Sequence, residues 1–341
     1  MNYYLSRKYR NYSSAGNKAR TDIEKVMQGM GIKNIGLPTS TYSNSVVGFV
    51  LNLLNILKAV ITLSKGDNIV LQYPIKKYFS FICKSAHLRG AKVIVVIHDL
   101  GSFRRKRVTS KAEIKRLNNA DYIISHNNKM KAWLLENGCT AKLGVLEIFD
   151  YLSNTKLSSS YEHKSPYSLV FAGGLSKKKS NFLYDIGDHL KTVGFVLYGN
   201  GFNIEAASGK EHFTYEGFKS SDELIESVKG DFGLVWDGDS LDKCSGNFGE
   251  YLKINNPHKT SLYIRCGLPI IIWEKAALAE FVKSNNIGIT INSLTEIEDR
   301  ISSITDEEYS LMRKNIDIVK NNLANGYYIK KALKDALLKI L

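Results

Sequence analysis

The sequence predicts an α/β protein with parallel sheets, and three observations lead to this class. Short apolar strands alternate with helices along the chain, the pattern that crossover connections between parallel strands produce. The run Val93–Ile97 is an unbroken stretch of β-branched residues, as expected of a central strand covered on both faces. The length of 341 residues favours two domains over one.

In the first half of the chain, six strands are predicted with helices between them. The strands are expected at Asn2–Leu5, Asn34–Leu37, Ile69–Gln72, Lys92–Ile97, Tyr122–Ser125 and Lys142–Val145. The helices are expected at Lys18–Met30, Ser45–Leu63, Ile75–Leu88, Lys111–Asn118 and Asn128–Glu136. The following stretch, Tyr151–Pro166, is rich in Ser, Lys and Tyr and has no periodic pattern, so it is interpreted as a linker.

The second half repeats the alternation. Its strands are expected at Ser168–Ala172, Phe195–Tyr198, Phe213–Tyr215, Phe232–Val235, Ile270–Ile272 and Gly288–Ile291. Its helices are expected at Asn181–Thr192, Ser221–Val228, Asn256–Cys266 and Ala276–Ser284, and the tail Thr305–Leu341 as two helices with a break near Asn325-Gly326. The prediction is two Rossmann-like domains facing a cleft, residues 1–150 and 167–324, with residues 325–341 returning as a helix to the N-terminal domain.

Composition narrows the class further. A hydrophobic content of 44% and a charged content of 23% are globular values. The four cysteines have no CxxC spacing, which argues against a structural zinc site and a disulfide framework. No apolar segment follows the charges at the N-terminus, and the apolar stretch Val46–Leu63 is interrupted by polar residues. A cytoplasmic protein without a membrane span is therefore expected.

The net charge of +14 has three candidate explanations: nucleic acid, an anionic membrane surface or a phosphorylated substrate. No nucleic-acid-binding signature accompanies the basic residues, so nucleic acid is not expected as a partner. Basic residues lie beside aromatics at Lys76-Lys77 and near the run Arg104–Arg107, which suggests peripheral contact with an anionic membrane. A basic solvated surface accounts for the same residues.

A glycine pair after a strand is the first phosphate candidate. Gly173, Gly174, Leu175, Ser176 and Lys177 follow the strand predicted to start at Ser168. Backbone N–H groups in such a turn, together with a lysine, bind phosphate oxygens. The other interpretation is a tight turn that uses glycine only for its backbone angles.

The segment Asn256–Tyr263 is the second phosphate candidate. Asn256 is expected to cap a helix that has Pro257 in its first turn. Lys259 and Tyr263 are four residues apart and share a helix face, so Lys259 can neutralise a diphosphate there. A capped surface helix with a basic side chain is the alternative.

Five further residues are candidates for the nucleotide or its sugar. Tyr198 and Gly199 end a strand and can line a base or ribose pocket, and Phe218 can stack on a base. Trp236 and Asp237 follow another strand, where Asp237 can bind the sugar. Asp237-Gly-Asp239 has the spacing of a metal-binding pair, but the glycine phosphate turn makes a metal unnecessary, and no metal site is predicted.

Candidates for chemistry lie in the first half. His98 and Asp99 follow the strand Lys92–Ile97, at the edge where ligands of α/β sheets bind. A carboxylate or imidazole can take a proton from a hydroxyl, and Asp99 is preferred over His98. The loop Ser13–Asn17 would let a ligand approach closely at Gly16. Strand termination and helix capping would explain the same residues.

Taken in order, several motifs resemble a known family. Phe171-Ala-Gly-Gly-Leu, Gly233-Leu-Val-Trp-Asp-Gly, Asn256-Pro-His-Lys-x-Ser-x-Tyr and Cys266-Gly-Leu-Pro are similar to segments of bacterial GT-B glycosyltransferases. The likeness is to galactofuranosyltransferases and related UDP-sugar glucosyltransferases of surface-glycan synthesis. Ser13–Arg20 and Ile97–Arg104 also fit, so the resemblance covers nearly the whole chain.

The resemblance implies a glycosyltransferase that moves a hexose, such as galactofuranose, from a UDP-sugar to a glycan or a lipid-linked glycan, with no cofactor and no essential metal. The nucleotide would bind the C-terminal domain and the acceptor the N-terminal one. Retaining members commonly carry two glutamates separated by seven residues, whereas Glu274 and Glu280 are closer together, which favours inversion. A non-catalytic GT-B-like module that binds a glycan or a partner is the alternative, and a homo-oligomer is left open.

Overall fold

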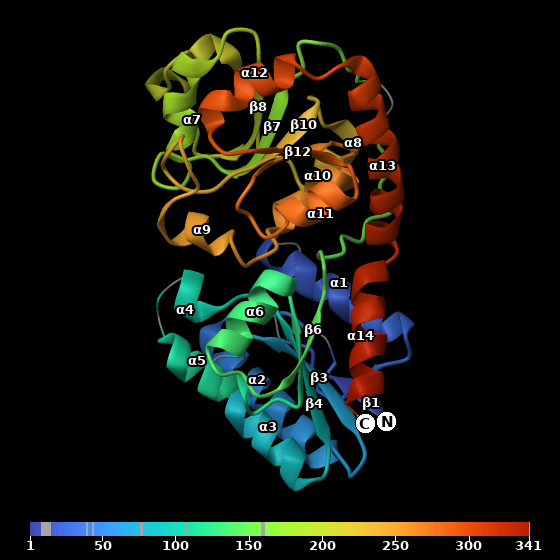
Figure 1. The fold of residues 1–341 in the computed structure, drawn as a ribbon. Coiled ribbons are helices and arrows are strands. Elements are labelled where there is room, and N and C mark those ends of the chain that lie inside the picture. The colour runs from blue at the N-terminus through green and yellow to red at the C-terminus, as the bar shows by residue number, and fades with distance from the viewer. Residues whose placement is uncertain are drawn as a thin grey trace. The chain divides into compact units, whose positions relative to one another are not determined.

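The computed structural model describes residues 1–7, 15–38, 40–42, 44–75, 78–104, 106, 108–157 and 161–340 (Figure 1). The chain divides into two compact units. The first unit comprises Met1–Asp150 with Gly326–Leu341, and the second comprises Tyr151–Asn325. Each unit has one six-stranded sheet, and every pair of neighbouring strands is parallel.

In the first unit the strand order is β2-β1-β3-β4-β5-β6. The strands are β1 (Asn2–Tyr4), β2 (Lys33–Asn34), β3 (Asn68–Tyr73), β4 (Lys92–Ile97), β5 (Tyr122–Ser125) and β6 (Lys142–Val145). The helices are α1 (Ala15–Gly29), α2 (Ser45–Thr62), α3 (Phe79–Leu88), α4 (Gly101–Arg104), α5 (Ser110–Leu117), α6 (Asn128–Glu136) and α14 (Tyr327–Lys339). The prediction of a fully covered central strand is confirmed, because Val93–Ile97 is completely buried.

The C-terminal helix α14 packs on the first unit. The carboxylate of Asp150 accepts hydrogen bonds from the N–H groups of Tyr328 (3.2 Å) and Ile329 (2.7 Å) at the helix start, where N–H groups have no acceptor within the helix itself. The hydroxyl of Tyr122 on β5 donates to Asp335 at 2.7 Å. The other tail helix, α13 (Asp306–Ala324), belongs to the second unit, so only one of the two predicted tail helices returns.

In the second unit the strand order is β12-β11-β10-β7-β8-β9. The strands are β7 (Leu169–Gly174), β8 (Phe195–Asn200), β9 (Phe213–Gly217), β10 (Phe232–Val235), β11 (Ile270–Trp273) and β12 (Gly288–Ile291). The α-helices are α7 (Phe182–Asp185), α8 (Ser221–Ser227), α9 (Gly246–Tyr251), α10 (His258–Arg265), α11 (Ala279–Ser284), α12 (Ile297–Ser302) and α13. All twelve predicted strands are present, with ends that differ by a few residues.

The helix predicted at Asn181–Thr192 is wrong. The chain forms one helical turn, α7, and then a 3₁₀ turn at Ile186–His189. Gly187 sits so close to the carbonyl of Ser208 that an added Cβ would lie 1.9 Å from that oxygen. This close approach fixes the backbone of the segment in a shape that a continuous helix would not allow. Sequence reasoning also missed the short helices α4, α9 and α12.

Candidate functional site

Topology selects one place in the second sheet for a ligand. From β7 the chain moves to β8 and β9 on one side, and then crosses to β10, β11 and β12 on the other side. The carboxyl ends of β7 and β10 therefore flank a topological switch point, where open α/β sheets bind ligands. The segments that leave these two strands are Gly173–Lys177, here called the glycine turn, and Trp236–Asp239.

The glycine turn is packed against the end of β8. Gly173 pairs with Gly199 in the sheet register, and a Cβ on Gly199 would lie 1.8 Å from the carbonyl oxygen of Gly173. Gly199 also has φ of +143°, a conformation that other residues rarely adopt. Gly173, Gly174 and Gly199 carry no side chains of their own, so a ligand can approach the backbone of these strand ends.

Tyr184, which sequence reasoning did not select, ties the loops after β7 and β8 together. Its hydroxyl lies 3.0 Å from the carbonyl of Leu175 and 3.2 Å from that of Gly201, and it accepts from the N–H of Asn203 at 3.2 Å. Leu175 is buried, whereas Ser176 and Lys177 are exposed. The turn therefore has a fixed base and two exposed polar side chains.

Helix α7, which follows the glycine turn, is too short to act as the predicted anion-binding helix. It has four residues, whereas the anion affinity of a helix start depends on aligned peptide dipoles and several free N–H groups. The binding capacity of this turn must come from its own backbone and from nearby cations. The prediction of a strand-to-helix phosphate turn is therefore wrong about the helix.

Lys179, which follows the turn, lies closer to the glycines than Lys177, the last residue of the turn. A Cβ on Gly174 would lie 3.0 Å from the Lys179 ammonium nitrogen, whereas the Lys177 ammonium sits over the Tyr184 ring, 5.9 Å from its centroid. Sequence reasoning missed Lys179, although the run of three lysines was the signal that contained it.

Lys259 of α10 reaches the switch point from the other side. Its ammonium bonds to the Asp237 carboxylate at 3.0 Å and to the Trp236 carbonyl at 3.3 Å. It also lies 4.5 Å from the ring centroid of Phe171 on β7. The structure thus brings Lys259 and Asp237 together, from segments predicted independently, beside the strand that leads into the glycine turn.

The start of α10 differs from the prediction. The N-cap is Pro257, which has extended backbone angles, and not Asn256, which is buried one residue earlier. Tyr263 is also completely buried: its ring packs on Gly233, and its hydroxyl accepts from the N–H of Ala172 at 2.8 Å. Burial raises the pKa of Tyr263, so it stays neutral and holds β7 in place instead of offering its ring to a ligand.

The two carboxylates of Asp237-Gly-Asp239 are engaged by different groups. Asp237 pairs with Lys259, whereas Asp239 accepts from the Ser245 hydroxyl, a bond that lowers the pKa of Asp239. Between them, Gly238 has φ of +120° and a backbone that passes close to Ser245. This geometry favours a fixed loop over a pair of converging metal ligands.

The remaining predicted nucleotide residues have unequal exposure. Tyr198 is buried, and its hydroxyl accepts from the N–H of Lys229 at 2.9 Å. Trp236 is completely buried, and its indole N–H donates to the carbonyl of Ser240 at 3.1 Å. Phe218 is 69% exposed in the loop after β9, at the edge of the sheet. Only Phe218 of these three presents a ring to solvent.

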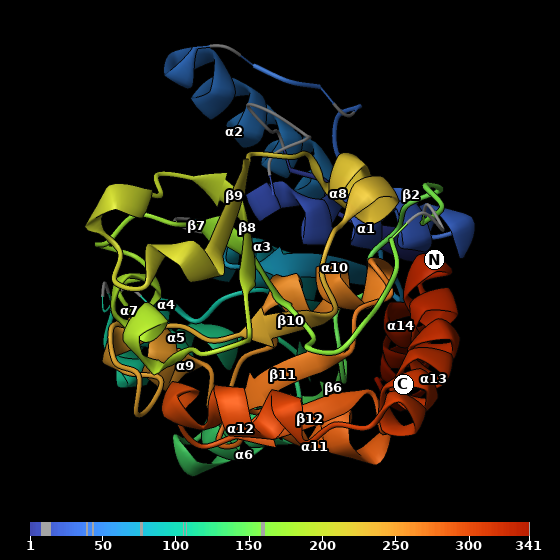
Figure 2. The ribbon, with the colours of Figure 1, turned by 90° about the horizontal axis from the view of Figure 1, so that it is seen from above.

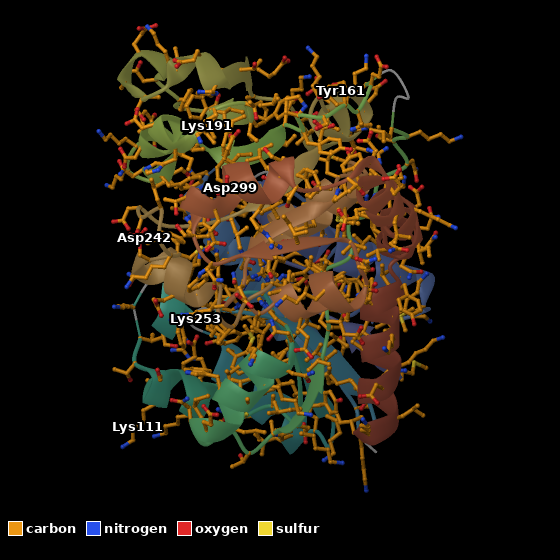
Figure 3. All side chains as sticks on the ribbon, turned by 45° about the horizontal axis from the view of Figure 1, so that its top comes forward. Lys111, Tyr161, Lys191, Asp242, Lys253 and Asp299 are labelled. Carbon is orange, nitrogen blue, oxygen red and sulfur yellow. The ribbon has the colours of Figure 1, made fainter. Side chains whose placement is uncertain are left out.

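Glu274 and Glu280, whose spacing favours inversion, lie before and on α11. Glu274 follows β11 and pairs with Lys283 at 3.2 Å, while Glu280 is exposed on α11. The neighbouring Trp273 is buried, and the ammonium of Lys253 lies 5.7 Å from its ring centroid. Figure 3 labels Lys253 among the side chains of the molecule. The Glu274 carboxylate is thus paired with a lysine of the same unit.

In the first unit, His98 belongs to a network of polar side chains. Its Nε2 lies 2.7 Å from the side-chain oxygen of Gln72, and its ring stacks on Phe149 with centroids 5.4 Å apart. The Gln72 amide also donates to Glu24, which accepts from the hydroxyl of Ser6 at 2.7 Å. Ser6, Gln72 and His98 lie at the carboxyl ends of β1, β3 and β4, so the structure assembles a polar cluster at that edge.

Asp99 is adjacent to this cluster. One of its oxygens accepts from Arg104 at 3.1 Å, and the other is buried with no hydrogen-bond partner in the described part of the chain. The short helix α4 that carries Arg104 is held by Glu113, whose carboxylate accepts from the N–H groups of Gly101 (2.9 Å) and Ser102 (2.8 Å). Asp99 therefore has one neutralised oxygen and one oxygen that can accept a proton.

His126, another residue that the sequence did not single out, follows β5. Burial lowers the pKa of His126 to about 3, so it stays neutral, and its Nε2 lies 3.1 Å from the carbonyl of Ile97. Its ring meets that of Phe149 edge-on at 4.9 Å. His126 therefore supports the aromatic ring on which His98 stacks.

Several predicted residues lie outside the described residues: Ser13, Ser14, Lys76, Lys77, Arg105 and Arg107. Gly16 is described only by its backbone, in the first turn of α1. The loop at Ser13–Asn17 and the basic runs therefore stay predictions.

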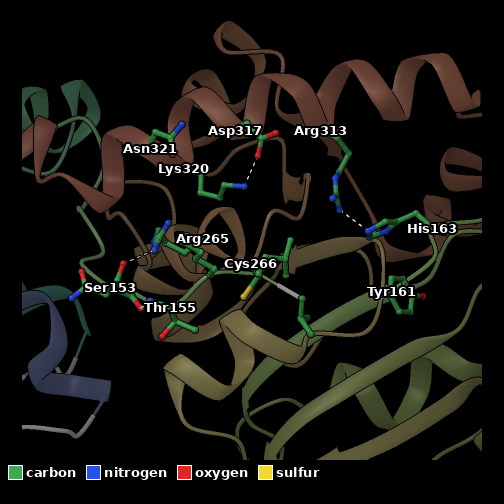
Figure 4. Close-up of a pocket in the computed structure, with 14 residues that line it drawn as sticks. Ser153, Thr155, Tyr161, His163, Arg265, Cys266, Arg313, Asp317, Lys320 and Asn321 are labelled. Carbon is green, nitrogen blue, oxygen red and sulfur yellow. Dashed lines mark hydrogen bonds and ion pairs between the residues drawn. The ribbon is translucent and has the colours of Figure 1, made fainter. Parts of the chain in front are cut away.

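A pocket of about 550 Å³ lies elsewhere in the second unit (Figure 4). Its walls come from the linker, from the end of α10 and from α13, with Arg265, Arg313 and Lys320 among the lining residues. His163 and Val228, also in its wall, precede β7 and β10, so this pocket lies toward the amino ends of the strands. It is separate from the switch point at their carboxyl ends.

Comparison with family models covers nearly the whole chain. Residues 2–148 match the model described as glucosyltransferase 3-like, N-terminal domain, and residues 169–336 match its C-terminal domain. The chain is 32% identical over 342 residues to the β-1,6-galactofuranosyltransferase WbbI of Escherichia coli (strain K12), covering 98% of each. It is 25% identical over 332 residues to glucosyltransferase 3 of Streptococcus gordonii, covering 95% of this chain and 94% of that protein.

Solved structures agree on the fold. The apo form of the lipopolysaccharide outer core galactosyltransferase WaaB superposes with a TM-score of 0.64 at 12% identity, covering 100% of both chains. WaaG, a glycosyltransferase involved in lipopolysaccharide biosynthesis, gives a TM-score of 0.54 at 10% identity, covering 97% of this chain and 98% of that one. The predicted GT-B fold with two α/β units is confirmed.

Proposed function

Because the chain belongs to the glucosyltransferase 3-like family of glycosyltransferases, we propose that it transfers a hexose from a UDP-sugar to a hydroxyl of a glycan acceptor. The second unit would bind the donor and the first unit the acceptor. The observation that carries the proposal is the Lys259 ammonium at the switch point, beside the strand that enters the glycine turn. A cation and open backbone at one sheet edge suit a diphosphate.

Each charged group of the second unit has a role in this proposal. Lys259 and Lys179 would offset the charge of the diphosphate, with Lys177 at the rim of the turn. The Asp237 carboxylate would repel phosphate oxygens, so it suits the hydroxyls of the sugar, which can donate to it. Phe218 would stack on the base.

The reaction would be a single displacement with inversion. The acceptor hydroxyl gives its proton to Asp99, or to His98, as its oxygen forms a bond to the anomeric carbon. The bond from that carbon to the β-phosphate oxygen breaks, and UDP leaves with the electron pair. The unpartnered oxygen of Asp99 supports its choice as the base, and the position of Glu274 in an ion pair with Lys283 supports inversion over retention.

No metal is required in this scheme, because lysines offset the charge that a divalent cation would otherwise neutralise. The separate engagement of Asp237 and Asp239 supports this part of the proposal. The acceptor would be a glycan or a lipid-linked glycan, and the reaction would take place in the cytoplasm or at the inner face of the membrane. The name of the relative WbbI makes galactofuranose the first sugar to test.

The test is a transfer assay in EDTA. Purified protein is incubated with UDP-galactofuranose or UDP-glucose and a panel of alkyl glycosides, and product is followed by chromatography and NMR. Transfer in EDTA with an anomeric configuration opposite to that of the donor is expected. Transfer that requires Mn²⁺ would refute the metal-free scheme, and a retained configuration would refute the displacement.

A further inference from the structure

The pocket at the amino ends of the second sheet is lined by an excess of positive charge (Figure 4). Among the described residues that form its wall, the cations are Lys156 of the linker, Arg265 of α10, and Arg313 and Lys320 of α13, and the one carboxylate is that of Asp317. These groups come from three separate segments of the chain, so the charge is gathered around a cavity. A concave site lined mainly by one sign of charge attracts the opposite sign, so an anion is the expected ligand.

Arg265 is the most deeply buried of these cations. Its side chain is only 6% exposed. Within the described part of the chain its guanidinium makes one hydrogen bond, from Nη2 to the carbonyl of Ser153 at 2.7 Å, and its Nε has no acceptor. A guanidinium has five N–H donors, and burying them without acceptors costs free energy. Burial also lowers the pKa of Arg265, which indicates that the surroundings do not fully compensate its charge.

A structural role accounts for part of this arrangement of Arg265. The residue lies in the last turn of α10, where the helix dipole favours a cation. Its bond to Ser153 also fastens the linker to the end of that helix. Both effects could be obtained with one donor at the surface, and they leave the other donors of a buried guanidinium unused. An anion in the pocket would supply the acceptors that these donors lack.

Helix α13 forms another wall of the pocket. It runs along one side of the second unit and packs against α10 (Figure 2). Its lining residues are Arg313, Asp317, Lys320 and Asn321, at positions i, i+4, i+7 and i+8, so they share one face of the helix. Lys320 forms an ion pair with Asp317. The positive excess of the pocket therefore comes from the cations outside that pair.

Arg313 is held in position by a neutral partner. Its Nη1 donates to Nε2 of His163 at 2.7 Å, and Nδ1 of the same ring lies 2.8 Å from the carboxylate of Asp231. The two contacts are satisfied together when the imidazole is neutral and carries its proton on Nδ1, toward Asp231. Arg313 then contacts no carboxylate directly and keeps its full charge beside the pocket.

The size and lining of the pocket narrow the class of anion. Its volume of about 550 Å³ is in the range of sites for small organic ligands and exceeds what a bare phosphate needs. Guanidinium groups bind phosphate oxygens through paired N–H donors. Asn154, Thr155 and Asn321, also in the wall, offer amide and hydroxyl groups that can bind the hydroxyls of a sugar.

We infer that this pocket binds a soluble hexose phosphate, whose phosphate group is held by Arg265 and Arg313 with Lys156 at the rim. The site is distinct from the switch point, which lies at the opposite ends of the strands. The inference therefore does not depend on the proposed donor or reaction.

The test is calorimetric titration of the full chain with glucose 1-phosphate, at low salt and in EDTA. The wild type is expected to bind it, and Arg265→Ala to weaken the affinity by about 10-fold or more, because a charge-assisted contact is lost. Lys156 is exposed, so Lys156→Ala should leave the fold intact and weaken binding by about threefold. Lys314→Ala is the matched control, because Lys314 is an exposed lysine of α13 outside the pocket.

Two further variants make the result decisive. Arg313→Gln should weaken binding as Arg265→Ala does, and it replaces Arg265→Ala if circular dichroism shows that the latter is unfolded. Lys259→Ala, which changes the switch point, should bind glucose 1-phosphate as the wild type does. A loss of binding in Lys259→Ala would place the phosphate at the switch point and overturn the inference.

The choice of ligand is tested with two other probes. Inorganic phosphate should bind more weakly than glucose 1-phosphate, because it makes no contact through a sugar, and equal affinities would overturn the assignment of a hexose. A wild type that does not bind glucose 1-phosphate at millimolar concentration would overturn the site. Binding only to vesicles of phosphatidylcholine and phosphatidic acid would overturn the assignment of a soluble ligand.

Discussion

The two units use similar parallel sheets but build different carboxyl edges. In the second unit the edge is made of backbone: Gly173, Gly174 and Gly199 lie at the ends of β7 and β8, with lysines placed around them. In the first unit the edge carries polar side chains, including Gln72 and His98, joined by hydrogen bonds. One edge suits a large anion held by N–H groups and cations, and the other suits recognition of hydroxyls and proton transfer.

The difference shows that two sheets of similar topology can bind different kinds of ligand, because the residues at their strand ends differ in size. A glycine edge allows close approach, and a crowded polar edge fixes side chains in defined orientations. The contrast supports the proposed assignment of the donor to the second unit and of the acceptor to the first. Three changes test it, beginning with the largest expected effect, and a fourth tests the acid stability of the second unit.

The polar edge is tested most strongly by Asp99→Asn. If Asp99 accepts the proton, kcat should fall by about 1,000-fold while the affinity for UDP stays the same. Steady-state kinetics and calorimetry with UDP measure the two quantities. Asp67→Asn is the matched control, because Asp67 lies at the opposite, amino edge of the same sheet. If both variants were equally active, Asp99 would not be the base, and His98 would be the next candidate to test.

The glycine edge is tested by replacing Lys179 and Lys177 with alanine, one at a time. Lys179 lies nearer to Gly174 than Lys177 does, so Lys179→Ala should raise the KM for the donor by about 10-fold and Lys177→Ala by less. Lys191→Ala, which removes an exposed lysine that precedes β8 at the amino ends of the strands, should leave the KM unchanged. A larger effect at Lys177 would show that the turn closes differently around the donor.

Gly199→Ala tests the close contact between β7 and β8. A Cβ at this position would overlap the carbonyl of Gly173, so the unfolding free energy should fall by about 1–3 kcal/mol and donor binding should weaken. Gly217→Ala is the control, because Gly217 also has a positive φ but has no atom within 4 Å of an added Cβ. If thermal denaturation showed that Gly199→Ala and Gly217→Ala lower the unfolding free energy equally, the loss would come from backbone strain at positive φ and not from the contact with Gly173.

Glu298→Gln is expected to lower stability at neutral pH and to have little effect in acid. Burial opposes ionisation of Glu298, but hydrogen bonds from Thr192 and the N–H groups of Lys191 and Val193 outweigh it and lower its pKa to about 2. Its folded pKa lies below the unfolded value, so its stabilising contribution is present above about pH 4.5 and is lost as pH falls toward 2. On the order of 3 kcal/mol should disappear from the wild type over that range, and the variant should show a flatter acid limb in denaturant titrations.

Sequence patterns predicted strands well and contacts poorly. The strands were recognisable because β-branched runs such as Val93–Ile97 depend on local chemistry. The helix predicted at Asn181–Thr192 failed because Gly187 meets Ser208, a contact between residues far apart in the sequence. For the same reason the exposure of Tyr263 and the reach of Lys179 could not be predicted, whereas Lys259 and Asp237 were selected as separate residues but not as a pair.

The measurement that tests the account most directly is calorimetric titration of UDP in EDTA into the wild type, Lys259→Ala and Lys191→Ala. The account predicts metal-independent binding to the wild type and Lys191→Ala, and a loss of about 100-fold in affinity for Lys259→Ala, because the ammonium at the switch point would contact the diphosphate. Binding that appeared only with Mn²⁺, or that was unchanged in Lys259→Ala, would contradict the placement of the donor at this edge.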